Sequence, residues 1–397
     1  MAQNSTPVAV RPLQILHIIV HLSAGGAELM MKRLILAQRG ARQLEHAVIS
    51  LRGLGSVGVE LQAAGINVIA LGLNAPYHLP NGLAKLVGLI RRIRPDVVQT
   101  WMYHADFLGG IAALVAAKAP VVWNVRIAEI APEFGVAPAT RWVMKACAIM
   151  SRLVPTRIVY VAHSARRIHE RNGYDPEKSL VIGNGYAIPT LAPPDRSRIR
   201  TELGLVPGAL LIGSAGRFNK QKNHHSFIVA CQLVAALQPQ AQFVLFGSGV
   251  DAENLELAEW IAATGYADRF HLKGERADLP RLMPALDVFC LHSLSEGFPN
   301  VVAEAMAAAV PCVVTDVGDA AALVADTGWV VPPADEAALA NALVAALQLD
   351  AAVRADYGLR ARARIESEFS MAAIADEYAR LYHEVAGRPL PTTSGTF

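Results

Sequence analysis

Residues 210–246 read LLIGSAGRFNKQKNHHSFIVACQLVAALQPQAQFVLF and carry the pattern that predicts the fold class. An apolar run at Leu210–Ala215 has the length of a buried strand, and a second such run follows at Gln242–Phe246. Between them, Asn223–Leu237 repeats apolar residues at the three- and four-residue spacing of a helix. A strand, a helix and a second strand in this order indicate a parallel sheet covered on both faces, and therefore an α/β domain.

The same alternation extends in both directions along the chain. Before residue 184 we expect strands at 13–20, 46–51, 67–71, 97–100, 121–125 and 157–161, and helices at 26–39, 83–94, 106–117, 138–153 and 164–171. After residue 246 we expect strands at 287–291 and 311–315, and helices at 252–263, from 299, and at 336–347, 351–366 and 371–386. Two such series predict two Rossmann-like, doubly wound domains in tandem. Ligands of these folds bind beyond the carboxyl ends of the strands, so the cleft between the domains is the expected site.

One segment interrupts the alternation and predicts the domain boundary. Asn184–Pro194 reads NGYAIPTLAPP, with three prolines and no periodicity, as expected of an interdomain linker. We therefore divide the chain into a first domain (1–189), a second domain (190–370), a last amphipathic helix (371–386) and a loose tail (387–397).

Composition excludes several classes of protein. The chain has 397 residues, of which 53% are hydrophobic and 18% charged, enough apolar material for two or three packed domains rather than a disordered chain. The net charge of +2 argues against a dedicated nucleic-acid binder. Four cysteines without a CxxC pair predict reduced thiols in the cytosol rather than disulfides or a zinc site.

The small net charge conceals an asymmetry between the two halves. Residues 1–189 hold 20 basic and 10 acidic side chains, a net charge of +10, whereas residues 190–397 hold 16 and 24, a net charge of −8. Opposite charges predict different partners for the two domains. We see no secretory signal and no run of about 18 apolar residues, so we expect a cytoplasmic protein without a spanning helix.

The strongest candidate for a site is the stretch SEGFPNVVAEAM at Ser295–Met306. It follows the strand predicted at 287–291, so Glu296 is expected on a loop at a strand's carboxyl end. Pro299 suits the first position of a helix, whose N–H groups at 300–302 would then favour an anion. With Glu304 one turn further on, two carboxylates could hold a sugar and a ribose, with phosphates between them. The alternative is a solvated loop glutamate and a second one that complements the helix dipole.

The second candidate is GSAGRFNKQKNH at Gly213–His224, where a predicted strand enters a helix. Arg217 and Lys222 could neutralise a diphosphate, and Gly216 would let the backbone approach the ligand. The alternative is a pair of solvated surface cations.

Weaker candidates lie in the first half of the chain. Gly25 and Gly26 follow the first strand and permit a tight turn, and His104 follows the strand predicted at 97–100. Trp101 could serve as a sugar platform or pack in the core, and Arg126 ends its strand as a candidate binder of an acceptor anion. A GxGxxG pattern at 53–58 follows the second strand and lacks an acid about 20 residues on, so it supports a dinucleotide site weakly. The sequence has no HxxH, DxD or GxSxG, and we expect no metal site and no serine elbow.

Together these residues resemble the retaining nucleotide-sugar glycosyltransferases of family 4. The similarity rests on the Arg217–Lys222 loop, the pair of glutamates eight positions apart in EGFPNVVAEAM, and the glycine pair after the first strand. The segments QTWMYHAD and VVTDVGD are similar to bacterial polysaccharide-assembly members, and the resemblance covers about residues 13–386. It implies a GT-B fold whose last helix crosses back to the first domain, with the nucleotide sugar bound by the second.

The resemblance also implies roles for individual residues. Glu304 would hold the ribose hydroxyls, and Glu296 the sugar hydroxyls, with help from backbone N–H groups of 297–300. Many relatives carry histidine where this chain has Trp101, which leaves the acceptor side open. The candidate catalytic residues are Arg217, Lys222, Glu296 and His104; the candidate donor-binding residues are Gly25, Gly26, Gly216, Gly297, Phe298, Asn300, Glu304 and Arg276; the candidate acceptor residues are Arg126 and Trp101.

The implied reaction is the transfer of a sugar, with retention, from a nucleotide-sugar donor to a saccharide or polyprenyl-linked acceptor, without a cofactor. A two-domain nicotinamide dehydrogenase and an inactive sugar-nucleotide-binding scaffold are the alternatives. The basic first half, and the helix predicted at 138–153 with its mixed basic and large apolar residues, suggest an anionic membrane surface as a further partner. The alternative is that this helix packs its apolar face on its own sheet.

Overall fold

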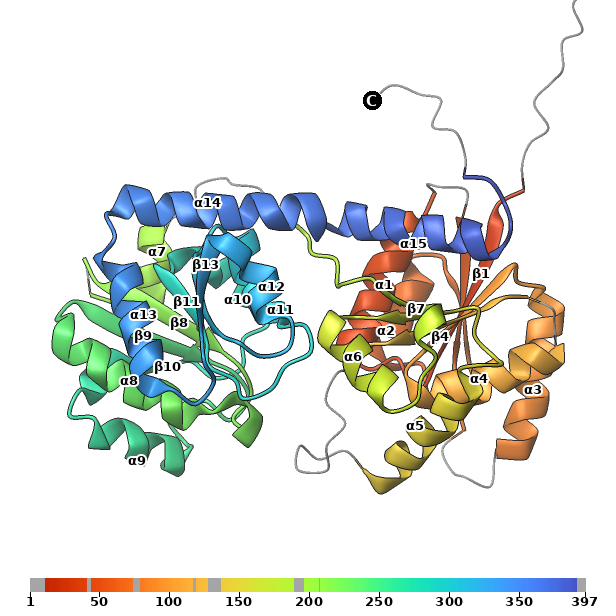
Figure 1. The fold of residues 1–397 in the computed structure, drawn as a ribbon, viewed down its shortest axis with the longest axis horizontal. Coiled ribbons are helices and arrows are strands. Elements are labelled where there is room, and N and C mark those ends of the chain that lie inside the picture. Colours follow the sequence, from red (N-terminus) through yellow and green to blue (C-terminus); the bar gives the residue numbers. More distant parts are fainter. Residues whose placement is uncertain are drawn as a thin grey trace, which may run out of the picture.

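The protein folds into two α/β domains joined by a long C-terminal helical segment (Figure 1). The computed structural model describes residues 11–40, 44–73, 79–116, 119–127, 137–188, 196–206 and 208–390. Its two sheets, of seven and six strands, are parallel throughout and confirm the predicted pair of Rossmann-like domains.

The first domain has the strand order β3-β2-β1-β4-β5-β6-β7. Its strands are β1 (Leu13–Ile19), β2 (Leu44–Ser50), β3 (Asn67–Ala70), β4 (Val97–Trp101), β5 (Val121–Val125), β6 (Arg157–Tyr160) and β7 (Ser179–Val181). Its helices are α1 (Gly26–Gln38), α2 (Gly55–Ala63), α3 (Leu79–Ile93), α4 (Tyr103–Ala116), α5 (Pro138–Met150) and α6 (His163–Arg171). Two buried clusters, one on each face of the sheet, form the core, as expected when helices cover both faces.

The second domain has the strand order β10-β9-β8-β11-β12-β13. Its strands are β8 (Leu210–Ala215), β9 (Ala241–Phe246), β10 (Phe270–Leu272), β11 (Val288–Leu291), β12 (Cys312–Thr315) and β13 (Gly328–Val331). Its helices are α7 (Arg196–Glu202), α8 (His224–Leu237), α9 (Leu255–Ala263), α10 (Leu279–Leu282), α11 (Asn300–Ala307), α12 (Ala320–Val324), α13 (Glu336–Gln348) and α14 (Ala351–Glu368).

The last helix, α15 (Met371–Val385), returns to the first domain, as the resemblance implied. In Figure 1, α14 lies along the second domain and α15 continues in the same direction over the first. Its Tyr378 and Tyr382 are fully buried in the core of the first domain. Asn124 Nδ2 on β5 donates to the Tyr378 hydroxyl at 2.7 Å, and the Tyr382 hydroxyl donates to Gln99 on β4. Buried contacts of this kind fasten the end of the chain to the sheet of its first domain.

The sequence did not predict three short strands and three short helices, α7, α10 and α12. β7, β10 and β13 lie at the edges of their sheets and span three or four partly buried residues, so they contain no long apolar run. α7 reads RSRIRTE and buries only Ile199, which leaves no helical periodicity to detect. Helix α4 begins at Tyr103, three residues earlier than expected, and therefore includes His104 in its first turn.

Parts of the predicted division lie outside the described residues. Residues 189–195 of the linker region and 391–397 of the tail belong to these parts, and the domain boundaries stay a prediction. At the described end of the linker, Tyr186 is buried and forms a backbone bridge with Ser370, immediately before α15. In the described chain, no single helix has the length and apolar composition to cross a membrane; α13 and α14 satisfy that test only as a pair, across a bend of 112°.

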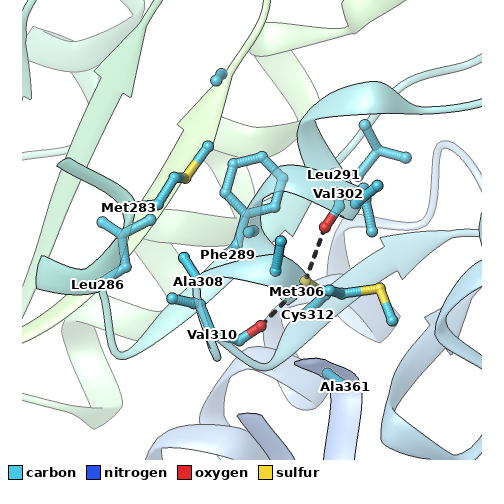
Figure 2. Close-up of a cluster of buried hydrophobic side chains, with 14 of the residues drawn as sticks. Met283, Leu286, Phe289, Leu291, Val302, Met306, Ala308, Val310, Cys312 and Ala361 are labelled. Carbon is cyan, nitrogen blue, oxygen red and sulfur yellow. Dashed lines mark hydrogen bonds between the residues drawn. The ribbon is translucent and has the colours of Figure 1, made fainter. Parts of the chain in front are cut away.

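The four cysteines are buried and unbridged, and one of them, Cys312, lies in the buried cluster shown in Figure 2. Cys312 at the start of β12 packs beneath α11 beside Phe289 and Met306. Its thiol donates weakly to the carbonyl oxygens of Val310, at 3.4 Å, and Val302, at 3.9 Å. The core under α11 is therefore continuous with the strands whose carboxyl ends form the candidate site.

Candidate functional site

Two loops meet at the carboxyl ends of adjacent strands in the second domain. The loop after β8 carries Arg217 and Lys222, and the loop after β11 carries Glu296. The Lys222 Nζ atom lies 2.5 Å from Glu296 Oε1, with the two side chains only 18% and 10% exposed. The structure therefore brings together two candidate residues that are 74 positions apart in sequence. A partly buried ion pair is stronger than a surface one because solvent screens it less.

The β8 loop also presents Arg217, whose side chain is exposed. Its neighbour Gly216 donates its N–H to the Phe246 carbonyl oxygen at the end of β9. Gly247 has a φ of 145°, and a Cβ there would lie 2.0 Å from the Gly216 carbonyl oxygen. Only glycine is compatible with this approach, so the loop rests directly on the neighbouring strand end.

Helix α11 begins one residue later than expected. Pro299 is its N-cap rather than its first residue, and the Val302 N–H donates to the Pro299 carbonyl oxygen at 3.0 Å. The prediction that the N–H groups at 300–302 are all available to an anion is therefore wrong for Val302. The Asn300 Oδ1 atom accepts hydrogen bonds from Asn184 Nδ2, at 2.6 Å, and from the Tyr186 hydroxyl, at 2.5 Å.

Glu304 lies one turn into α11 and is partly buried. Burial raises the pKa of its carboxyl group, and the positive charge of Arg33, on α1 of the first domain, opposes this shift. Phe298, which precedes the helix, stacks on Tyr186 with ring centroids 6.2 Å apart. The donor-side candidates thus lie where the second domain faces the first.

On the first domain, the candidates next to the cleft are largely exposed. Gly25 is the N-cap of α1, and a Cβ there would lie 2.4 Å from Glu28 Oε2, whereas a Cβ on Gly26 would meet nothing within 4 Å. His104 is exposed on the first turn of α4, and partial burial of its ring, followed by the charge of Arg52, lowers its pKa.

The two acceptor candidates are instead part of the protein's framework. Trp101 is fully buried, and its Nε1 donates to His17 Nδ1 at 3.2 Å, so it cannot act as an exposed sugar platform here. The Arg126 guanidinium donates to Ile182 O at 2.9 Å and Gly183 O at 3.1 Å, and it also binds the side chain of Asn184. Burial lowers the pKa of Arg126. This guanidinium is committed to the start of the linker, which argues against an acceptor anion.

Arg276 is also committed to protein contacts. Its guanidinium pairs with Asp278 at 2.7 Å and with Glu202 at 3.2 Å, and Arg281 joins the same two carboxylates. The side chain therefore links α7 to the segment after β10.

Sequence reasoning missed the contact that joins the two domains beside the donor loop. Asp319 follows β12 and accepts hydrogen bonds from the backbone N–H groups of His163, at 2.6 Å, and Ser164, at 2.8 Å, at the start of α6. Its own N–H donates to the Gly297 carbonyl oxygen at 3.0 Å. A carboxylate at a helix N-terminus is stabilised by the unpaired N–H groups there. Asp319, the second of the two aspartates in VVTDVGD after a predicted strand, was the available signal.

Three further features of the described residues concern the glycine pattern, metal ligands and a cavity. The glycine pattern at 53–58 leads into α2, which begins at Gly55. Among the described residues, no group of three or more His, Cys, Asp or Glu side chains could hold a metal ion. A cavity of about 600 Å³ between the domains is lined by residues including Phe298, Asp319, Arg364 and Phe369.

Two Rossmann-like domains with a cation and carboxylate cluster between them define a protein of the GT-B class. Comparison with known families agrees: residues 24–188 match the family described as Glycosyltransferase Family 4, and residues 209–349 match Glycosyl transferases group 1. The chain belongs to these glycosyltransferases.

Characterised relatives and solved structures extend the comparison. An Escherichia coli UDP-Gal:alpha-D-GlcNAc-diphosphoundecaprenol alpha-1,3-galactosyltransferase is 29% identical over 66% of this chain and 69% of its own length. The lipopolysaccharide core mannosyltransferase LpsB of Rhizobium meliloti is 30% identical over 52% and 61%. The crystal structure of Anabaena Alr3699/HepE in complex with UDP has a TM-score of 0.80 at 24% identity, covering 94% of this chain and 100% of that one. This last similarity supports the GT-B fold.

Proposed function

We propose that this glycosyltransferase moves a sugar, with retention of anomeric configuration, from a nucleoside-diphosphate sugar to a lipid-linked saccharide in cell-surface polysaccharide assembly. The observation that carries the proposal is the Lys222–Glu296 pair at 2.5 Å, with Arg217 exposed on the same loop as Lys222 and Glu304 on the helix that follows Glu296. The E. coli relative uses UDP-Gal and a diphosphoundecaprenol-linked acceptor by name, which supports a nucleotide-sugar donor and a lipid-linked acceptor.

The donor would lie with its diphosphate against the β8 loop. Cleavage of the bond between the anomeric carbon and the phosphate oxygen leaves the electron pair on the diphosphate. Positive side chains that face this developing charge lower the barrier because they stabilise the transition state more than the ground state. Arg217 and Lys222 would supply this charge from the protein, so we propose a reaction that needs no metal ion.

The two glutamates would bind hydroxyl groups at opposite ends of the donor. Glu304 would accept hydrogen bonds from the ribose, and Glu296 from the transferred sugar. We propose that the acceptor oxygen attacks the same face of the sugar from which the diphosphate departs, and that a diphosphate oxygen takes its proton. The new bond then keeps the configuration of the bond that breaks.

A transfer assay tests this proposal. The protein is incubated with a panel of UDP- and GDP-sugars and a polyprenyl-diphosphate-linked saccharide, with and without excess chelator. We expect transfer from at least one donor, a product with the donor's anomeric configuration by NMR, and no loss of activity in chelator. An inverted product would contradict the mechanism, and absence of binding to every nucleotide sugar would contradict the function.

The surface of the first domain supports a location on the inner, cytoplasmic face of the cell membrane. On and just after α5, Trp142, Ile149 and Leu153 are 71%, 76% and 80% exposed, whereas Met144, Cys147 and Ala148 face the core. Lys145 Nζ lies 5.3 Å from the centre of the Trp142 ring. A helix that buries one apolar face and exposes further large apolar side chains among cations suits an anionic membrane interface.

Liposome sedimentation tests the membrane location. We expect binding to anionic vesicles that weakens in high salt, and little binding to neutral ones. The variant with Trp142, Ile149 and Leu153 changed to serine should lose binding and keep its stability. As a control, Leu237→Ser and Leu255→Ser alter two exposed leucines of the acidic second domain, at 61% and 76% exposure, and should leave binding unchanged. Equal binding by both variants would contradict this surface.

A further inference from the structure

A buried serine contacts the same carboxylate oxygen that pairs with Lys222. Ser293 lies two residues after β11 and is 1% exposed. Its hydroxyl donates to Glu296 Oε1 at 2.7 Å, and Lys222 Nζ approaches the same oxygen at 2.5 Å. Within the described residues, the protein contacts of this carboxylate go to Oε1, which leaves Oε2 for a ligand hydroxyl.

The serine is itself held by the neighbouring strand. The Thr315 hydroxyl, at the end of β12, donates to the Ser293 carbonyl oxygen at 2.8 Å, and Thr315 is also buried. The backbone of Ser293 is therefore fixed from the side of β12. Because the residue is buried and its backbone is held, its hydroxyl can direct Glu296 with little loss of side-chain entropy.

Lys222 is anchored to the β11 loop by its backbone, independently of its ammonium group. The Lys222 carbonyl oxygen lies 2.5 Å from His292 Nδ1, and because a carbonyl can only accept, this nitrogen carries the proton. His292 Nε2 then accepts from the Ser214 hydroxyl at 2.6 Å. One residue earlier, the Gln221 carbonyl oxygen accepts from Leu294 N at 2.8 Å. The ammonium can thus move while the loop stays in place.

We propose that Ser293 is a positioning residue that keeps Glu296 directed at the donor sugar when Lys222 turns to the diphosphate. This inference rests on the proposed function. Without donor, the opposite charges of Lys222 and Glu296 satisfy each other. A bound diphosphate competes for the ammonium, and Ser293 then remains as the side chain that holds Oε1 and leaves Oε2 facing the sugar hydroxyls.

The test compares binding of UDP with binding of UDP-sugars by calorimetry. For Ser293→Ala we expect the Kd of UDP to stay within about twofold of wild type. The Kd of the best-bound UDP-sugar should rise about tenfold, which corresponds to the loss of one hydrogen bond to a charged group. The isosteric Thr315→Val should change the ratio of the two constants in the same direction by a smaller factor, since it loosens Ser293 without removing its hydroxyl.

Ser226→Ala is the matched control. Ser226 is a buried serine of the same domain, on α8, whose hydroxyl also donates to a glutamate, Glu336 Oε1 at the start of α13, at 2.6 Å. Its ratio of Kd values should equal that of wild type. A Ser293→Ala variant that loses UDP and UDP-sugar affinity equally, or keeps both, overturns the inference. A wild-type protein that binds neither ligand contradicts the proposed donor instead.

Discussion

The two sheets have similar strand topologies, but the polar side chains near their carboxyl ends have different partners. In the second domain, Lys222 and Glu296 bind each other at the edge of the cleft, where a ligand can exchange with them. In the first domain, Arg126 and Asn124 bind α15 and the residues after β7 and are removed from the cleft. A Rossmann-like sheet end is therefore a binding site only where nothing else in the chain covers it.

The difference follows from the path of the chain. The first sheet receives α15 from the far end of the sequence, and polar side chains of β4 and β5 satisfy the buried hydroxyls of Tyr378 and Tyr382. Buried polar groups need partners, so this docking consumes side chains that would otherwise contact a ligand. Among the described residues of the second domain, Lys222 and Glu296 at the corresponding strand ends pair with each other instead.

The largest effect that would test this contrast is on Arg126. Arg126→Met removes donors to two carbonyl oxygens and to Asn184, all at the partly buried start of the linker. We expect a loss of about 3 kcal/mol or more in the free energy of unfolding, measured by urea denaturation, because buried acceptors lose their partners. Arg157→Met is the control: it joins α15 through an exposed pair with Glu384 and should cost less than about 1 kcal/mol. Equal costs would show that Arg126 is not structural.

On the second domain, the loss should appear in activity rather than in folding. Lys222→Met removes the proposed charge on the departing diphosphate, and we expect kcat/KM to fall about a hundredfold or more, close to 3 kcal/mol of transition-state stabilisation. Lys220→Met changes an exposed lysine of the same turn and should have little effect. Near-normal turnover in Lys222→Met would contradict the assignment.

The pH dependence of unfolding tests a buried carboxyl group of the first domain. Asp106, fully buried on α4, has its pKa raised by burial to about 7, partly offset by the hydrogen bond from Thr100. A carboxyl group with a raised folded-state pKa is best tolerated when protonated, so stability falls as the pH rises from about 4 to 7. Relative to wild type, Asp106→Asn should therefore gain roughly 2 kcal/mol between pH 5 and pH 8.

The control for this titration is an exposed aspartate. The Asp326 side chain is 86% exposed, and Asp326→Asn should follow the wild-type pH dependence of unfolding. If Asp106→Asn showed no more pH dependence than Asp326→Asn, the buried carboxyl group would not titrate in this range.

The smallest effects are expected for the two glutamates, which we assign to different parts of the donor. Glu304→Gln should weaken UDP binding about tenfold, whereas Glu296→Gln should spare UDP and slow sugar transfer by a similar factor. Because burial raises the pKa of Glu304, UDP affinity should fall on acidification at a higher pH than an ordinary glutamate would give. Calorimetry with UDP and with a UDP-sugar measures the two affinities, and a transfer assay measures the rate. Equal losses of UDP affinity in the two variants would contradict the division of roles.

The sequence by itself determined the two α/β domains and placed each donor loop at the carboxyl end of a strand. Strand and helix periods are local properties, and parallel strands place their carboxyl ends at one edge of the sheet. Adjacent positions of β8 and β11 in that sheet therefore bring Lys222 to Glu296. The order of the strands, which makes β8 and β11 neighbours, came from the structure and not from the sequence pattern.

Only the tertiary structure decided which polar strand ends remain exposed. Asn124 and Tyr378 are 254 positions apart, yet their side chains form a hydrogen bond, and the partly buried Arg126 guanidinium donates to the same Tyr378 hydroxyl at 3.3 Å. Trp101 likewise became a core residue through His17 on the neighbouring strand. Burial depends on what packs over a residue, and a local sequence pattern carries no record of a helix that returns from the other end of the chain.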